Sequence, residues 1–320
     1  MTFSHGREET PLSPRKNKLY DMKKNKSFIV LAVAVCLIFV MGLALLLYPT
    51  VSNFWNEKRS EKLISDYIAN VSEAKGEDYS AEFKAAEEYN KTLEGKGIPD
   101  AFAFISEEED ETYMSLLSQS SNGVMGFIKI PKINVSLPIY HTTEKSVLEK
   151  GVGHLRGSAL PVGGRGTHCV LSAHRGLPSA ALFTDLDLLS EGDRFFIYVL
   201  DRALAYEVDQ ILEVEPDETE SLDVSEDGDL VTLVTCTPYG VNSHRLLVRG
   251  HRVEYTESDV AEAKKNAVGS IYTNYTLWLT VSAAFTVVFV VSMILFIKKR
   301  KPVEDGTDRK KTDRSGGPRQ

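Results

Sequence analysis

The 320-residue sequence contains only three cysteines, and one of them, Cys36, lies inside a long apolar segment. The remaining two, Cys169 and Cys236, are too few for the disulfide framework that stabilises many small secreted domains. We therefore expect two unpaired thiols, one of which has a chemical role. A single bridge between Cys169 and Cys236 is the alternative.

Other signals are also missing from the sequence. It has no internal repeat, and its acidic stretch 213–229 lacks the residue spacing of a known calcium-binding loop. A solvated connection between strands is the better interpretation of that stretch. Because 42% of the residues are hydrophobic and 26% are charged, a globular protein is indicated rather than a disordered chain. We expect no cofactor, no metal and no nucleic-acid partner.

Charge is absent from two long segments, residues 28–48 and residues 275–297. Each is long enough to cross the apolar core of a bilayer as a helix, and buried core helices are the alternative. A cleaved signal peptide is a further alternative for the first segment. Its apolar run exceeds the usual ~7–15 residues, however, and no clear small-x-small site follows it. We therefore predict two membrane-spanning helices, the first of them uncleaved.

The charges outside these segments are distributed unevenly. Residues 1–27 carry seven Lys or Arg against three Asp or Glu, and residues 298–320 carry nine against four. The remaining 21 basic and 38 acidic residues lie between the two spans. By the positive-inside rule both basic tails are cytoplasmic, so residues 49–274 form an extracellular domain tethered to the cell membrane.

This extracellular part divides into regions of different pattern. Residues 49–122 are predicted as a helical region, with one helix after Pro49, a second over 81–93 and a stretch of loop composition at 95–111. The pattern changes to period two over 123–256, and a juxtamembrane linker follows at 257–274. Many short strands at this spacing favour a closed barrel or a sandwich. Seven segments are predicted as strands: 126–130, 135–139, 168–173, 194–200, 203–214, 230–235 and 245–255.

The stretch TLVTCTPYGVNSHR, residues 232–245, places a cysteine at the end of one predicted strand and an arginine at the start of the next. Thr232, Val234 and Cys236 share one face, so the thiol lies at the tip of the strand. If the two strands pair as a hairpin, Cys236 and Arg245 become neighbours at one edge of the sheet. A cation there favours the nucleophilic thiolate and can stabilise an oxyanion during attack on a carbonyl.

A thiolate nucleophile also requires an acid to protonate the leaving amine. Among the seven histidines, His174 follows the strand over 168–173 and occupies an edge position like that of Cys236. From their positions at the ends of predicted strands, Cys236 and His174 are one candidate catalytic pair. Cys169, in mid-strand, is more often a small buried apolar residue. The other histidines have weaker claims from their positions: His5, His141, His154, His168, His244 and His251.

Longer stretches of the sequence resemble one known family. The segments LSAHRGLPSAALFTDLDLL (171–189) and TLVTCTPYGVNSHRLLVRGHR (232–252) closely resemble the sortases, particularly the class C, pilus-assembling sortases. The upstream segments GFIKIPKINVSLPIY (126–140) and GVGHLRGSALPVGG (151–164) also fit that class. The resemblance covers Met125 to Val253, and the layout of two anchors fits as well.

The resemblance implies a mainly β chain, with an eight-stranded closed β-barrel, N-terminal helices and a lid loop between two transmembrane helices. It implies a cysteine transpeptidase in which Cys236 is the nucleophile, His174 is the acid and Arg245 is the third catalytic residue. The family pattern around the cysteine is T-x-T-C-T-P. In this sequence Val234 makes the stretch read TLVTCTP. The implied substrate is an LPXTG-like sorting signal of a pilin, cleaved between Thr and Gly through a thioester. A lysine amine of a second pilin then resolves that thioester.

The lid of class C sortases is an N-terminal loop with an Asp-Pro-aromatic motif that covers the active site. The resemblance assigns it to residues 96–106, with Asp100, Ala101 and Phe102 at the motif. Alanine stands where the family has proline, so this lid is expected to be less stiff.

Three alternatives differ from a sortase that joins pilins. A sortase that attaches surface proteins to peptidoglycan uses a cell-wall amine, and a cysteine protease releases its product to water. A non-catalytic adhesion module would leave Cys236 unreactive towards a thiol probe.

Overall fold

The computed structural model describes residues 14–73, 78–93, 111–118, 123–223, 227–256, 259 and 271–299. The chain divides into two compact units. One comprises the described residues up to Leu45 together with those from Thr276 on. The other comprises the described residues from Leu46 to Tyr275 and contains every strand that the structure describes.

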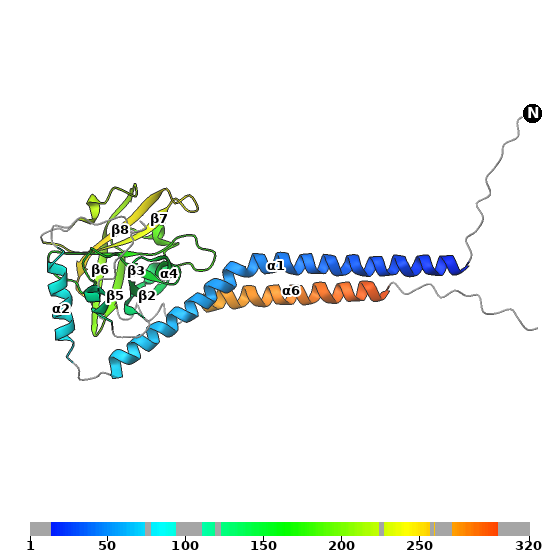
Figure 1. Cartoon of the computed structure of the whole chain (residues 1–320), viewed down its shortest axis with the longest axis horizontal. Helices are drawn as coiled ribbons and strands as arrows, with labels where there is room; N and C mark the ends of the chain where they lie inside the picture. Colours follow the sequence, from blue (N-terminus) through cyan, green and yellow to red (C-terminus); the bar gives the residue numbers. More distant parts are fainter. Residues whose placement is uncertain are drawn as a thin grey trace, which may run out of the picture. The chain divides into compact units, whose positions relative to one another are not determined.

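The first unit consists of two apolar helical segments, which belong to α1 (Pro14–Glu73) and α6 (Ile271–Lys299). Early residues of one segment meet late residues of the other, so the two helices pack antiparallel (Figure 1). Three ring contacts join them: Phe28–Phe296, Phe39–Phe285 and Phe39–Phe289. These aromatic residues come from the two segments that the sequence predicts to span a membrane.

Helix α1 is long and apolar enough over Ser27–Glu73 to cross a membrane, as judged by its length and composition. Helix α6 contains a shorter apolar stretch, Thr280–Phe296, among its described residues. Pro49 lies inside α1, and the helix continues through it. The predicted first span and the predicted helix after it therefore form one element.

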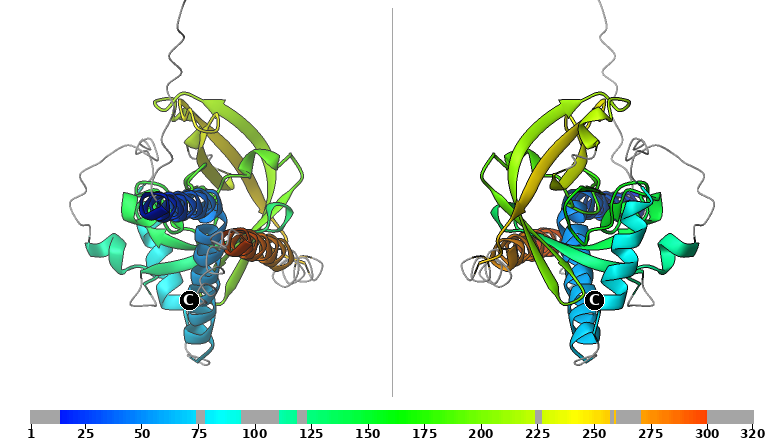
Figure 2. Two further views of the ribbon diagram at one scale, coloured as in Figure 1. Left: turned by 90° about the vertical axis from the view of Figure 1, so that its right-hand side faces the viewer. Right: turned by 90° about the vertical axis from the view of Figure 1, so that its left-hand side faces the viewer.

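The second unit is built around a closed barrel of eight strands (Figure 1). Their order around the barrel is β1-β2-β3-β4-β7-β8-β6-β5, and the long strands β6 and β8 lie side by side in both views of Figure 2. The predicted fold class is confirmed. The strands are β1 (Val124–Ile130), β2 (Val135–His141), β3 (Val152–His154), β4 (Thr167–Ser172), β5 (Arg194–Val199), β6 (Arg202–Val214), β7 (Asp229–Thr237) and β8 (His244–Val253).

All seven predicted strands are present, and their ends shift by at most two residues. The strand that the sequence did not predict is β3. Its three residues are too few to show a period-two pattern, and they owe their extended form to pairing with β2 and β4.

Short helices pack around the barrel. Helix α2 matches the predicted second helix and places Phe83 and Ala86 in the main apolar core. Helix α3 was not predicted, because five residues show no clear helical period, and it adds Tyr113 to the same core. The remaining elements complete the set: α2 (Ser80–Lys91), α3 (Glu111–Ser115), α4 (Lys145–Leu148) and the 3-10 helices η1 (Pro131–Ile133), η2 (Leu186–Leu188) and η3 (Glu220–Leu222).

The order of the strands in the barrel determines which strand ends lie next to one another. Strand β4 lies parallel to β7, with Ser172 level with Val234, and β7 lies antiparallel to β8. Parallel neighbours run in the same direction, so they end at the same edge of the sheet. The ends of β4 and β7 and the start of β8 therefore share one rim of the barrel, which we call the Cys236 rim.

Candidate active site

Cys236 and Arg245 are direct partners across β7 and β8. Arg245 Nη1 lies 3.7 Å from Cys236 Sγ, a distance at which it donates a hydrogen bond to sulfur. The connecting turn is tight, because the Pro238 carbonyl accepts hydrogen bonds from the amides of both Val241 and Asn242. The hairpin pairing considered from the sequence thus brings the thiol and the cation together.

The surroundings of Cys236 favour reactivity. Its side chain is partly exposed at the end of β7, whereas its neighbours Thr235 and Thr237 are buried. A guanidinium at this distance can stabilise negative charge on the sulfur when the thiol gives up its proton. The same N–H groups can donate to the oxygen of a carbonyl under attack.

His174 follows β4 by two residues and reaches the same rim. The Ala173 amide donates to the Val234 carbonyl at 3.2 Å, and Thr235 Oγ1 donates to the Ala173 carbonyl at 2.8 Å. These bonds extend the pairing of the two segments beyond the end of β4. Continuing the β4–β7 register by two residues brings His174 level with Cys236.

Burial lowers the pKa of His174 below its ordinary value of 6.5; Glu149, which follows α4, opposes this shift and Lys145 of α4 reinforces it. The imidazole is therefore mainly neutral at neutral pH. A neutral imidazole can accept the thiol proton and afterwards return a proton to a leaving amine, as nucleophilic catalysis by a thiol requires.

Three other histidines, His141, His154 and His168, are buried. Both ring nitrogens of His154 and of His168 lie within hydrogen-bond distance of protein atoms. Burial lowers the pKa of all three, that of His154 to about 4. They are neutral groups of the barrel wall and have no place at the Cys236 rim.

The two histidines of β8 have other neighbours. His244 begins the strand, but the alternation of side chains turns it to the opposite face from Arg245, where its Nδ1 lies 2.8 Å from Ser243 Oγ. His251 lies farther along β8, with Nδ1 3.9 Å from the Asp209 carboxylate. Strand pairing thus favours His174 as the proton carrier.

Cys169 lies in the main apolar core, level with Val231, and no disulfide joins it to Cys236. Burial, reinforced by Asp229, raises the pKa of the Cys169 thiol well above its usual value. This thiol therefore stays protonated and is a poor nucleophile. The alternative of a disulfide between the two cysteines is excluded.

Two further arginines of β8 are engaged elsewhere. Arg249 donates from Nε and Nη2 to the Asp209 carboxylate at 3.0 and 3.1 Å. Arg252 Nη1 lies 3.8 Å from the Asp229 carboxylate. Among the described arginines of this strand, Arg245 is the one that contacts Cys236.

Contacts that the sequence did not predict also support this rim. Arg175, directly after His174, pairs with Asp187 of η2. From α1, Asn53 Oδ1 accepts the Ala181 amide at 2.7 Å and so holds the loop that follows His174. The first contact spans 12 residues and the second 128, so neither follows from the period of a single helix or strand.

The predicted lid, residues 96–106, lies outside the described residues, and Asp100 and Phe102 with it. Their assignment remains a prediction from the resemblance.

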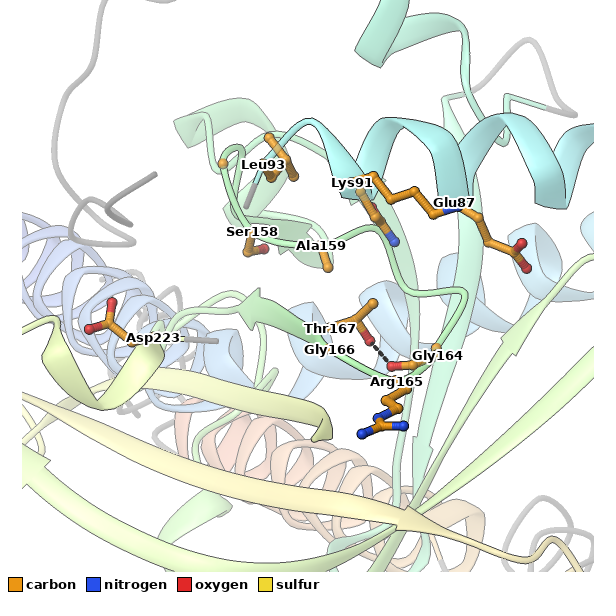
Figure 3. A pocket seen from close by; sticks show the side chains of 13 residues that line it. Glu87, Lys91, Leu93, Ser158, Ala159, Gly164, Arg165, Gly166, Thr167 and Asp223 are labelled. Atoms are coloured by element: carbon orange, nitrogen blue, oxygen red, sulfur yellow. Dashed lines mark hydrogen bonds between the residues drawn. The ribbon is translucent and has the colours of Figure 1, made fainter. Parts of the chain in front are cut away.

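A pocket of about 360 Å³ opens between α2 and the connection from β3 to β4 (Figure 3). Figure 3 shows Lys91 of α2 on one side and Thr167 on the other, where Thr167 Oγ1 donates to the Gly164 carbonyl at 2.6 Å. Thr167 begins β4, whereas His174 follows its end. The pocket therefore lies at the opposite end of that strand from the candidate catalytic residues.

Comparisons of the sequence and of the structure with known proteins point to one family. A protein-family model, that of the sortase domain, matches residues 128–253 of this chain. These residues include all three candidate catalytic residues. Sortase C-1 from Actinomyces oris is 47% identical and covers 56% of this chain and 100% of its own, with a TM-score of 0.53. The sortase C of Streptococcus pneumoniae, whose structure bears on catalysis and pilin substrate specificity, is 41% identical. It covers 61% of this chain and 98% of its own, with a TM-score of 0.55. Sortase A of Bacillus anthracis is 25% identical over 232 residues, 72% of this chain and 97% of that protein.

The barrel, the thiol paired with a cation and these similarities define a cysteine transpeptidase, and the chain belongs to the sortase family. Within that family it is a class C sortase, since solved class C structures reach 47% sequence identity with it.

Proposed function

We propose that this chain is a membrane-anchored transpeptidase that joins pilin subunits, with Cys236 as nucleophile, His174 as proton carrier and Arg245 as oxyanion partner. The observation that carries the proposal is the 3.7 Å approach of Arg245 Nη1 to Cys236 Sγ, at a rim that His174 also reaches. The substrate class is an LPXTG-like sorting signal, cleaved between threonine and glycine.

In the first half-reaction, Cys236 Sγ attacks the threonine carbonyl carbon of the signal. The thiol proton passes to neutral His174, while Arg245 donates to the carbonyl oxygen as that oxygen gains negative charge. When the C–N bond breaks, His174 gives its proton to the departing glycine amine. A thioester on Cys236 remains.

In the second half-reaction, a lysine amine of another pilin attacks the thioester carbonyl. His174 accepts a proton from that amine, and Arg245 again stabilises the oxyanion. Collapse of the tetrahedral intermediate breaks the C–S bond, and His174 returns its proton to the sulfur of Cys236. The product is an isopeptide bond between two pilins.

Pilin substrates are supported by the class C resemblance and by similarity to the Streptococcus pneumoniae sortase C, whose structure bears on pilin specificity. A sortase that attaches surface proteins to peptidoglycan shares the first half-reaction and differs in the amine. A cysteine protease differs in using water. The resolving nucleophile therefore decides between the three.

The test incubates the full chain, in detergent micelles, with a pilin that carries an LPXTG-type signal, and mass spectrometry follows the products. We expect an acyl adduct on Cys236 and then a lysine-linked pilin dimer. Free acid formed whether or not an acceptor is present would favour a protease, and transfer to a peptidoglycan amine alone would favour the anchoring sortase. An enzyme that turns over without any adduct on Cys236 would contradict the assignment.

We also propose a topology in which both termini are cytoplasmic. The antiparallel packing of the apolar segments of α1 and α6 supports two tails on one side of the membrane. Protease added to intact cells should then degrade the region between the spans and spare tags at both ends; an accessible C-terminal tag would contradict this. The proposed regions are a tail at 1–27, a span at 28–48, a helical region at 49–122, the barrel at 123–256, a linker at 257–274, a span at 275–297 and a tail at 298–320.

For the lid we propose that Asp100 and Phe102 restrict access to Cys236, as the class C resemblance implies. The double variant Asp100→Ala/Phe102→Ala should then be labelled faster at Cys236 by a small thiol reagent, with little loss of thermal stability. Equal labelling rates in a folded double variant would remove the gating role.

A further inference from the structure

Arg175 is a nearly buried arginine in the loop that leaves β4, directly after His174. Its side chain is 9% exposed and forms an ion pair with the Asp187 carboxylate on η2. Its Nη1 donates to Thr237 Oγ1 at 3.4 Å, and its Cζ lies 5.9 Å from the centroid of the Tyr239 ring. A single cation therefore connects the loop after β4 with η2 and with the end of β7.

The segments that carry His174 and Cys236 are joined just before these two residues. There, Thr235 Oγ1 donates to the Ala173 carbonyl at 2.8 Å, and both residues are fully buried. This bond fixes the approach of the two segments at the last position before the candidate catalytic pair.

The same segments are joined again just after the pair. Arg175 follows His174, Thr237 follows Cys236, and the hydrogen bond between Arg175 and Thr237 links the two segments a second time. The candidate pair is thus held between two contacts from one segment to the other. The two contacts flank the positions at which the strand register sets His174 level with Cys236.

The second contact lies away from the reacting atoms. The Thr237 side chain is buried and faces the opposite side of β7 from Cys236, because side chains alternate along a strand. Arg175 reaches it on that side. The guanidinium therefore acts on the spacing of the two segments and does not touch the sulfur.

An arginine is an unfavourable choice for stability alone at such a buried position. Its Nε is buried and has no hydrogen-bond partner among the described residues. The guanidinium loses solvation on burial, and because its partner Asp187 stays 43% exposed, the ion pair offsets little of that cost. The planar guanidinium, however, donates in fixed directions, so it sets the separation of its partners more narrowly than apolar packing does.

We propose that Arg175 is a positioning residue that sets the separation of His174 from Cys236 by holding both Thr237 and Asp187. This inference rests on the roles proposed above for His174 and Cys236. Proton transfer depends on a defined distance, whereas binding of the sorting signal does not depend on this contact. We expect Arg175→Gln to lower kcat roughly 10–100-fold with little change in KM.

The deciding measurement is the pH dependence of Cys236 alkylation by iodoacetamide, in the full chain in detergent micelles. Mass spectrometry of the Cys236 peptide gives the rate at each pH. His174→Ala should shift the midpoint of this profile, because the proposed pair makes the imidazole the base that takes up the thiol proton. Arg175→Gln should shift it in the same direction and should add no further shift in the double variant with His174→Ala.

The outcomes separate the two proposals. An unchanged midpoint in His174→Ala means that the proposed pair itself fails. A shift in His174→Ala but none in Arg175→Gln overturns only the positioning role. The same holds if Arg175→Gln adds its full shift in the double variant, because Arg175 would then act independently of His174.

Matched variants guard against a simple folding defect. Thr237→Val removes the hydroxyl acceptor and keeps the shape, so it should reproduce the Arg175→Gln shift, whereas Thr237→Ser should behave as wild type. Equal profiles for the two Thr237 variants would overturn the proposal. Arg194→Gln breaks ion pairs to Glu207 and Asp259 at another place in the barrel and should leave the midpoint unchanged. A shift there would show that the profile reports general loosening instead of positioning.

Discussion

Strands β4 and β7 lie side by side and parallel, and a histidine and a cysteine occur near each end of the pair. His168 and Cys169 lie near the start, and His174 and Cys236 lie at the finish. At the start both side chains are buried; His168 Nε2 lies 2.7 Å from Thr232 Oγ1, and Cys169 is enclosed in the core. At the finish both side chains are partly exposed, and an arginine donates to the sulfur.

The difference shows that residue type alone does not make a nucleophilic pair. Burial keeps the Cys169 thiol protonated, because it raises the pKa of that group. Cys236 combines access for a substrate with an adjacent cation, which favours the thiolate. The two ends of the β4–β7 pair therefore differ in the solvent access of the cysteine and in the presence of a neighbouring cation.

The strongest way to break this comparison is to remove each thiol in turn. We expect Cys236→Ala to abolish both the thioester and transpeptidation, because Cys169, the other thiol of this unit, is enclosed in the core. Cys169→Ala should keep most activity and lose some stability through the small cavity left in the core. Mass spectrometry of acyl adducts measures the first effect and thermal unfolding the second. Turnover by a folded Cys236→Ala protein would sink the assignment.

Replacing the two histidines should likewise affect different properties, activity for His174 and stability for His168. His174→Ala should lower kcat/KM by about 10²–10⁴, the usual contribution of general acid–base catalysis. His168→Ala should leave the chemistry intact and lower the free energy of unfolding by about 1–3 kcal/mol, because it leaves buried polar atoms without partners. Peptide cleavage rates and urea unfolding distinguish these results. A His168→Ala protein that is stable but inactive would reverse the comparison.

Arginines of β8 provide a third pair. Arg245→Gln should lower kcat by about 10²–10³, and Arg245→Lys should also be poor, because lysine keeps the charge but loses the planar fork. Arg249→Gln is the matched control, since its partner is the Asp209 carboxylate. Single-turnover acylation rates give the measurement. A near wild-type rate for Arg245→Lys would mean that charge alone is sufficient.

The prediction with the smallest expected effect on activity concerns pH and stability. The pKa of His154 falls from 6.5 in the unfolded chain to about 4 in the folded barrel, because burial disfavours the charged form. Between these values the unfolded state binds a proton that the folded state does not, so stability falls as the pH falls from 6.5 towards 4. His154 alone should contribute a loss of about 3 kcal/mol. Unfolding by urea at pH 7 and pH 4.5 measures it, and a His154→Gln variant that keeps the full slope would contradict it.

Local patterns in the sequence determined much of this fold. Alternation of apolar and polar residues marks seven of the eight strands, because each spans enough residues to show a period of two. The neighbourhood of Cys236 and Arg245 also follows from local sequence, since a short turn joins two predicted strands and so favours their pairing as a hairpin. The long stretches of sortase-like sequence identify the family.

Tertiary structure decided what local patterns cannot encode. His174 and Cys236 are 62 residues apart in the chain, and only the parallel pairing of β4 with β7 brings them level. The same pairing buries His168 and Cys169, which are the same two residue types as the candidate catalytic pair. Arg175 likewise acquires its partners from η2 and β7. Burial and long-range pairing arise from the closure of the whole barrel, so a single segment carries no signal of them.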